Sequence, residues 1–324
     1  MPTTLTNQSY AMKIELSIRI GREKKNDTQG MLPHENLVHA AKKIIDSVEG
    51  QKRRKTIDNY KTAIRAVERC FGDKLYLDSL TSNTMEQFAY WLRDQGICPN
   101  TMSCYMRSLR SLTTLLVGKE LSGKLFAQVF TGNTRTVKRA VDTADIIRLK
   151  SISLPPYSYL SKARDLFLFC FYAQGIPFVD AVRLQWSQVS QEALTFYRHK
   201  NGQRVSVALD PLLTQIMQRY RSEHSDWVFP DFHPVDERDY QLQLNRYNRA
   251  LKRLTELADI KSKLTSYVAR HSWASMAYRA NVDLPVISKA LGHTNPQTTL
   301  IYVKEINDAR LAQANRKLLD AFRQ

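Results

Sequence analysis

Two short stretches near the C-terminus carry side chains that can act on a phosphate group. Residues 267–274 read Y-V-A-R-H-S-W-A, and residues 291–302 read L-G-H-T-N-P-Q-T-T-L-I-Y. The fork of Arg270 can grip two oxygens of an anion, and the imidazole of His293 can donate a hydrogen bond or carry a proton near neutral pH. Tyr302 supplies a hydroxyl that can act as a nucleophile. Each residue alone has an ordinary structural explanation, such as an ion pair or a helix end, so their joint order and spacing indicate the site.

This order and spacing resemble those of the tyrosine recombinase (phage integrase) family. Its members carry H-x-x-R-H, then L-G-H about two dozen residues later, then T-T and a nucleophilic tyrosine. The resemblance implies that Arg270 is the arginine of H-x-x-R, that His293 is the histidine of L-G-H and that Tyr302 is the nucleophile. It also implies that Lys200 is the lysine at the tip of the family's β-hairpin. The likeness extends over residues 35–324, but only the C-terminal motifs are specific.

The chemistry of the family explains why these side chains belong together. Attack on a phosphodiester builds a pentacoordinate, doubly negative phosphorane, and cations and hydrogen-bond donors must hold this charge in a site without metal. The resemblance implies that Tyr302 becomes joined to the 3′-phosphate, which keeps the bond energy for resealing, so no metal, nucleotide or other cofactor is expected. Lys200 is expected to protonate the leaving 5′-oxygen. The expected enzyme is therefore a site-specific DNA recombinase.

The sequence departs from the family at its first catalytic arginine. The family pattern is T-G-L-R-x-x-E, whereas residues 174–180 read Q-G-I-P-F-V-D, so Pro177 stands in the arginine position. Loss of one phosphate-binding arginine costs several kcal/mol of transition-state stabilisation, on the scale of a lost oxyanion donor. Another cation must replace it. We rank Arg183 first, because it lies almost one helical turn beyond this motif, ahead of Arg164 and Arg198.

A second departure is Tyr267, which replaces the first histidine of H-x-x-R-H. A phenol can donate a hydrogen bond, but it is a poor base at neutral pH. The combination of G-x-x-F-V-D, a tyrosine in this position and R-H-S-W-A resembles integrases of conjugative elements. This resemblance implies that the loss of the arginine at Pro177 is a trait of a subgroup rather than inactivation.

The hydrophobic periodicity predicts a mainly α-helical protein of two domains. Residues 31–130 are expected to form a helical core DNA-binding domain, matching the family's core-binding, SAM-like domain in position and size. Residues 131–143 are typical of a basic linker, and residues 144–324 of a catalytic domain with mixed helices, a small β-sheet and a C-terminal helix. In the extension formed by residues 1–30, strict alternation over Met12–Ile20 predicts one strand, which a flexible connection follows.

Two helices of the first domain are marked by their own start signals. Residues 81–83 can cap a helix whose apolar stripe is Met85, Phe88, Trp91 and Leu92. A second helix is expected to begin after Pro99-Asn100-Thr101 and to turn Arg107 and Arg110 outward.

The small sheet of the second domain is expected from two strand-like runs, Leu194–Tyr197 and Arg204–Leu209. An Asn-Gly pair between them is a strong hairpin signal and places Lys200 near the tip. A short helix is expected over Asp180–Trp186. The other expected helices of this domain cover residues 143–150, 163–173, 211–222, 238–258, 266–280, 284–291 and 307–322.

A surplus of positive charge indicates a polyanionic partner. Lys and Arg number 48 against 31 Asp and Glu, a formal net charge of +17, so double-stranded DNA with specific recombination sites is the expected partner. A basic run beside Thr56, interpreted as a helix cap, would lie where a phosphate can approach a helix start, although such a run is ordinarily a solvated helix end. The candidate DNA-binding residues are Lys52, Arg53, Arg54, Lys55, Arg107, Arg110, Arg135, Lys138, Arg139 and His271.

Other classes of protein are disfavoured. The longest apolar run, Leu166–Ala173, is far shorter than the roughly 20 residues of a membrane-spanning helix, and the first ten residues lack the features of a secretory signal. Four scattered cysteines encode neither a zinc site nor a disulfide framework. A cytoplasmic location without a membrane partner is the expectation.

The family suggests a homo-tetramer on two DNA sites, in which the helix over residues 307–322 docks on a neighbouring protomer and DNA-bending proteins can assist. Integration, excision and inversion are all compatible with the sequence. Two other functions stay open. One is a DNA-binding protein that kept the fold while Pro177 removed the activity, and the other is a type IB-like topoisomerase that relaxes supercoils without needing a specific site.

Overall fold

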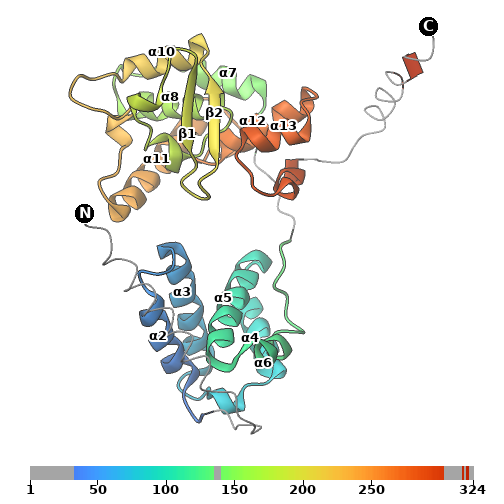
Figure 1. Cartoon of the computed structure of the whole chain (residues 1–324). Coiled ribbons are helices and arrows are strands. Elements are labelled where there is room, and N and C mark those ends of the chain that lie inside the picture. Colours follow the sequence, from blue (N-terminus) through green and yellow to red (C-terminus); the bar gives the residue numbers. More distant parts are fainter. Residues whose placement is uncertain (1–32, 135–139, 303–315, 317–318, 321–324) are drawn as a thin grey trace, which may run out of the picture. The chain divides into compact units, whose positions relative to one another are not determined.

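The computed structural model describes residues 33–134, 140–302, 316 and 319–320 (Figure 1). The chain divides into two compact units between Thr136 and Val137, within the stretch 131–143. The expected strand over Met12–Ile20 and most of the expected helix over residues 307–322 lie outside the described residues. The described elements are mainly helices with one two-stranded sheet, which confirms the predicted fold class.

The first unit is a bundle of helices around one apolar core. Its elements are α2 (Leu37–Val48), α3 (Arg54–Phe71), η1 (Leu77–Ser79), α4 (Ser82–Asp94), α5 (Pro99–Val117) and α6 (Lys119–Leu125). Helix α5 packs against α2, α3, α4 and α6. The hydroxyl of Thr81 caps α4 by accepting from the Thr84 N–H, and the helix buries Met85, Phe88 and Leu92. The predicted stripe and its cap are therefore confirmed.

The start of α3 differs from the expectation at Thr56. The helix begins at Arg54 with Arg53 in the N-cap position, so Thr56 is already inside the first turn and is not the cap. Arg53 makes no side-chain capping hydrogen bond, and the first turn holds no acidic residue. Residues 52–55, all cationic, are exposed. Because the N-terminal N–H groups of a helix are also positive, this end of α3 favours anions.

The second unit is built around α8, which buries most of its length. Its elements are α7 (Thr143–Ser151), α8 (Tyr159–Tyr172), α9 (Phe178–Ala181), η2 (Trp186–Gln188), β1 (Ala193–Tyr197), β2 (Arg204–Ala208), α10 (Pro211–Arg219), η3 (Pro230–Phe232), α11 (Glu237–Leu257), α12 (Val268–Arg279), α13 (Leu284–Ala290) and η4 (Pro296–Tyr302). Helices α7, α10, α11 and α12 pack on α8, which explains why the run Leu166–Cys170 is apolar on every side.

The helix expected over Asp180–Trp186 is wrong in its extent. Helix α9 ends at Ala181, and the chain then extends to pair with a distant segment. The Leu184 carbonyl accepts from the Val228 N–H at 2.9 Å, and the Trp186 N–H donates to the Asp226 carbonyl at 2.9 Å. These tertiary hydrogen bonds replace the helical ones.

Strands β1 and β2 form an antiparallel hairpin with Ala193 opposite Ala208 and Tyr197 opposite Arg204. Beyond the last pair, the Arg198 N–H donates to the Gln203 carbonyl at 2.9 Å. In the loop, Gly202 has a φ of 69°, whereas Asn201 keeps a negative φ. A two-residue type I′ turn needs a positive φ at both central residues, so this loop is of a longer type. It contains Lys200, as predicted.

Candidate active site

Arg270 is the most deeply enclosed of the predicted functional residues that the structure describes. It lies on α12 with 2% of its surface exposed. One terminal nitrogen donates to the Gly175 carbonyl at 3.0 Å. The other, Nη2, donates to the Leu291 carbonyl at 2.6 Å and lies 3.0 Å from Nε2 of His293. Two main-chain carbonyls thus hold the guanidinium in one orientation.

The position shortly before α9, Gly175, requires a glycine. Its φ is +74°, and a Cβ at this position would lie 2.9 Å from the Cα of Arg270. Real Cβ atoms do not approach backbone atoms so closely, so any side chain would push α12 away. The glycine therefore lets α12 and the Gly175 carbonyl come together around the arginine.

His293 is half-buried and makes a contact through each ring nitrogen. Nε2 faces Arg270, and Nδ1 lies 2.9 Å from Oγ1 of Thr299, a buried residue of η4. Burial, together with the positive charges of Arg270, Arg198 and Lys200, lowers the pKa of His293 to about 4. The imidazole is therefore neutral at physiological pH in the absence of an anion.

Arg198 joins the same group of side chains from the end of β1. Only 7% of it is exposed, and it donates to the Leu291 carbonyl, the acceptor that Arg270 also uses. Its Nε forms an ion pair with Oδ2 of the buried Asp180 at 2.6 Å, although the two atoms lack hydrogen-bond geometry. Oδ1 of Asp180 accepts from the His199 N–H at 2.8 Å. Asp180 thus fixes both the arginine and the start of the hairpin loop.

We call Arg198, Arg270 and His293 the arginine–histidine cluster. The hairpin loop is tied to it by a second hydrogen bond, from the Asn201 amide to the Gly292 carbonyl at 3.1 Å. Gly292 has a φ of +63°, and a Cβ there would lie 3.0 Å from Cγ of Arg198. The glycine of L-G-H is therefore required by its conformation and by the close approach of the hairpin.

Lys200 and Tyr302 are the remaining predicted catalytic residues, and the structure describes them to different extents. Lys200 is exposed on the hairpin loop, and it is close enough to His293 to lower the pKa of the imidazole. Tyr302 is the last residue of η4, which packs against α12 and α13, and its side chain lies outside the described residues. The structure therefore brings the backbone of the predicted nucleophile to the helices that frame the cluster.

Arg183, the surrogate that ranks first from the sequence, makes other contacts. It donates to the Val179 carbonyl at 3.0 Å, and its guanidinium lies over the ring of Tyr240 at 4.8 Å. Arg164 is also engaged elsewhere, with the Ile152 carbonyl and with Asp165. Of the three candidate arginines, Arg198 is the one that shares a hydrogen-bond acceptor with Arg270.

Tyr267 precedes α12 and is half-exposed, with its ring 5.1 Å from the ring of His271. The cationic candidates of the first unit, Arg107 and Arg110 on α5 and residues 52–55 at the start of α3, are exposed. Arg135, Lys138 and Arg139 lie outside the described residues. A role of these side chains in DNA binding remains a prediction.

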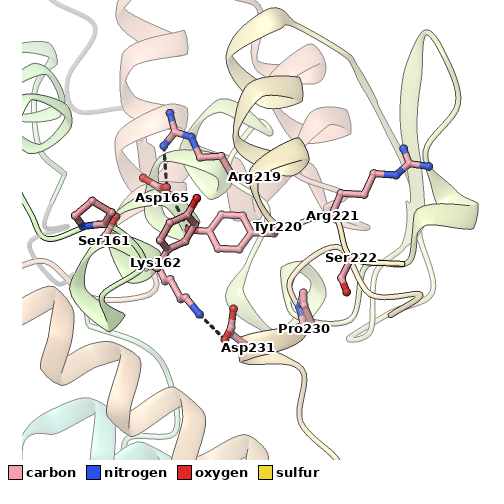
Figure 2. A pocket seen from close by; sticks show the side chains of 11 residues that line it. Ser161, Lys162, Asp165, Arg219, Tyr220, Arg221, Ser222, Pro230 and Asp231 are labelled. Carbon is pink, nitrogen blue, oxygen red and sulfur yellow. Dashed lines mark hydrogen bonds and ion pairs between the residues drawn. The ribbon is translucent and has the colours of Figure 1, made fainter. Parts of the chain in front are cut away.

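A cavity of about 520 Å³ lies in the wall formed by α8, α10 and η3 (Figure 2). Most of its charged side chains pair within the wall. Lys162 lies 2.6 Å from Asp231, and Asp165 accepts from Arg219 and Tyr220 at 3.0 and 3.2 Å. Figure 2 marks these contacts with dashed lines and shows Arg221 apart from them. No member of the arginine–histidine cluster lines it, and we assign it a structural role.

In the part of the chain that the structure describes, no three His, Cys, Asp or Glu side chains gather in a way that could hold a metal ion. No helix in the same residues is long and apolar enough to cross a membrane.

The fold resembles that of solved integrases. One is the Tn1549 transposon integrase in complex with transposon right end DNA, with a TM-score of 0.66, 13% identity, and coverage of 88% of this chain and 100% of that one. Another is a lambda integrase tetramer bound to a Holliday junction, with a TM-score of 0.66, 12% identity, and coverage of 91% and 86%. At such identities the likeness shows the fold alone.

Sequence comparisons define the family. Residues 147–308 match the phage integrase family, and residues 36–120 match the phage integrase SAM-like domain. The chain belongs to the phage integrase family, which confirms the resemblance that its motifs indicate. It is 24% identical over 281 residues to the tyrosine recombinase XerD of Bradyrhizobium diazoefficiens, covering 78% of this chain and 87% of the relative. It is 22% identical over 283 residues to the tyrosine recombinase XerS of Streptococcus thermophilus, covering 72% and 78%.

Proposed function

We propose that this protein is a site-specific tyrosine recombinase that cleaves and rejoins double-stranded DNA through a 3′-phosphotyrosyl intermediate at Tyr302. The observation that carries the proposal is the convergence of Arg198 and Arg270 on the carbonyl of Leu291, with His293 beside them. Two guanidiniums in one buried site suit an anion. A phosphodiester is the anion that family membership indicates.

Arg198 takes the place of the arginine that Pro177 removes. Each guanidinium is held in place before the substrate arrives, with N–H groups that a nonbridging phosphate oxygen can accept. Such preorganised donors stabilise the phosphorane most, because nothing has to be reoriented in the transition state. This weighs against the alternative of a DNA-binding protein inactivated at Pro177, since a second arginine is still present.

The remaining roles follow from the chemistry of the step. The Tyr302 hydroxyl passes its proton to solvent and attacks phosphorus, the bond to the 5′-oxygen breaks, and Lys200 gives a proton to the leaving oxygen. Rejoining runs the same transfers backwards with the 5′-hydroxyl of a partner strand. Tyr267, in the place of the family's first histidine, is expected to donate a hydrogen bond to the phosphate.

The DNA partner and the assembly are part of the same proposal. The solved neighbours include a DNA-bound transposon integrase and a tetramer on a Holliday junction, and a tetramer on two DNA sites is the arrangement we propose here, with accessory DNA-bending proteins as candidate partners. Residues 52–55 are expected to contact the phosphate backbone. A substrate of cellular DNA implies a cytoplasmic location.

Covalent trapping tests the proposal. The full chain is incubated with a library of nicked duplexes of randomised sequence, and the products are resolved under denaturing conditions. Cleavage near the nick releases a short fragment, which prevents rejoining. The wild type should form a covalent adduct, Tyr302→Phe should form none, and Tyr157→Phe should form it normally, because Tyr157 is 83% exposed and outside the cluster.

Two results of the same experiment would refute the proposal. Binding of the library without an adduct from the wild type would support the inactivated DNA-binding protein. Relaxation of a supercoiled plasmid that lacks the selected sequence, at the rate found with that sequence, would support a topoisomerase.

A further inference from the structure

Asn201 in the hairpin loop uses both ends of its side-chain amide. Its Nδ2 donates to the Gly292 carbonyl at 3.1 Å, and its Oδ1 accepts from the Gln203 N–H at 3.4 Å. A carbonyl can only accept and an N–H can only donate, so these two partners fix the orientation of the amide. The bond to Gln203 is a local turn of the kind that asparagine often forms. The bond to Gly292 joins positions 91 residues apart, and a turn does not require it.

Lys200 lies between two attachment points of this loop. Before it, the His199 N–H donates to Oδ1 of Asp180 at 2.8 Å, and after it, Asn201 reaches Gly292. Lys200 itself is exposed. Exposed loops are ordinarily more mobile than the elements that they connect. The two attachments therefore keep the backbone of Lys200 beside the arginine–histidine cluster before any DNA is bound.

We propose that Asn201 is a positioning residue, which holds the hairpin loop against residues 291–293 so that Lys200 is in place to protonate the leaving 5′-oxygen. The inference rests on the proposed function and deepens it. A general acid must lie within hydrogen-bond reach of the atom that receives its proton. A lysine on a detached loop would meet this condition for only part of the time.

The cleavage step contains one proton transfer that depends on this loop. As the bond between phosphorus and the 5′-oxygen breaks, that oxygen takes a proton from the Lys200 ammonium, which becomes a neutral amine. A sulfur atom in the place of the 5′-oxygen can leave as a thiolate without a proton, because the pKa of a thiol, about 8.5, is far below the value of about 15.7 for water. A sulfur substrate should therefore make the position of Lys200 unimportant.

Cleavage of paired substrates tests the inference. The full chain is given, in single turnover, a nicked duplex selected by covalent trapping, with either oxygen or sulfur at the 5′ bridging position of the cleaved phosphate. With oxygen, Asn201→Ala should form the adduct about 10-fold more slowly than the wild type, because one hydrogen bond shifts an equilibrium by about 2- to 13-fold. Lys200→Ala should be slower by about 100-fold or more. With sulfur, both variants should come within about threefold of the wild type.

Three further variants serve as controls. Asn201→Asp keeps an acceptor for the Gln203 N–H but has no donor for the Gly292 carbonyl, so it should be slow with oxygen and restored by sulfur. Gln203→Ala keeps the backbone contacts of the loop and should match the wild type with both substrates. Arg270→Lys should stay slow with sulfur, because the guanidinium is proposed to act on the nonbridging oxygens.

Two results would overturn the inference. One is a normal rate with oxygen for Asn201→Ala or Asn201→Asp. The other is equally slow cleavage of both substrates by these variants, which would show that they disturb the whole site rather than the position of Lys200.

Hydrogen exchange measures the attachment of the loop without DNA or cleavage. The His199 amide donates to Asp180, and this bond breaks when the loop moves away. Its exchange should be about 2- to 13-fold faster in Asn201→Ala than in the wild type and unchanged in Gln203→Ala. Equal exchange in Asn201→Ala and the wild type would refute the role. If the wild type formed no adduct with either substrate, the proposed function would fail, and hydrogen exchange would decide whether Asn201 holds the loop.

Discussion

Replacing Asp180 by Asn should destabilise the second unit more than any change to an exposed ion pair. Asp180 and Arg198 are buried, and their charges lie 2.6 Å apart. Asparagine keeps the volume and the acceptor for the His199 N–H, but it leaves the guanidinium without its counter-charge. Removing one partner of a buried pair typically costs about 3–5 kcal/mol. For a unit of about 190 residues, this corresponds to a fall in Tm of about 6–20 °C.

Calorimetry of the full chain, with the transition of the second unit followed separately, measures this loss. The matched control is Glu256→Gln, which breaks the exposed pair of Glu256 with Arg253 at 2.9 Å and should cost less than about 0.5 kcal/mol. Adding Arg198→Gln to Asp180→Asn should cost less than the sum of the single changes, because both charges are then gone. A loss in Asp180→Asn no larger than in Glu256→Gln, or strict additivity in the double variant, would refute this account of the pair.

Three further outcomes are expected. Gly175→Ala should destabilise the second unit by about 1–3 kcal/mol, because a Cβ would meet Arg270 and the φ is positive. Gly123→Ala, where a Cβ has open space in α6, should cause no such loss, and urea titrations of both variants measure the difference. In the unfolded chain His293 becomes protonated below about pH 6.5, whereas in the folded chain it becomes protonated only near pH 4. The free energy of unfolding should therefore fall as the pH decreases from about 6.5 to about 4, and His293→Gln should make this fall smaller. Changing the four cations at the start of α3 to alanine should reduce the slope of log affinity for DNA against log salt by up to about 3.6; an unchanged slope would argue against phosphate contacts by Lys52, Arg53, Arg54 and Lys55.

The elements with strong local signals could be predicted from the sequence. The stripe of Met85, Phe88, Trp91 and Leu92 after three possible caps at residues 81–83 predicts α4, and two strand-like runs around Asn-Gly predict the hairpin. Failures occur where tertiary contacts compete with local preference. Thr56 has the right side chain for a cap, but the helix begins at Arg54. The segment after Ala181 leaves its helix because residues 226–228 offer backbone partners.

Within the site, the motifs predict Arg270 and His293, which the structure brings together, but they do not point to Arg198, the surrogate arginine that we propose. Ranking Arg183 first rests on helical spacing from α9, and α9 ends before reaching it. A better signal was present in β1, where burial alternates and Leu194, Phe196 and Arg198 share the inward face. An arginine that follows the same alternation as buried apolar residues should have a buried partner. The partner, Asp180, and the role of Leu291's carbonyl arise only from folding.

Arg198 and Lys200, the two cations of the hairpin that we propose act on the phosphate, are separated by a single residue of the loop, whereas Pro177, in the position of the family's arginine, directly precedes α9. An insertion or deletion between Arg198 and Lys200 would change their spacing around the proposed phosphate site. Relatives that carry proline at the start of this helix should therefore vary less in the length of the hairpin loop than relatives that have arginine there. Engineered variants with new specificity in the hairpin should keep a single residue between Arg198 and Lys200.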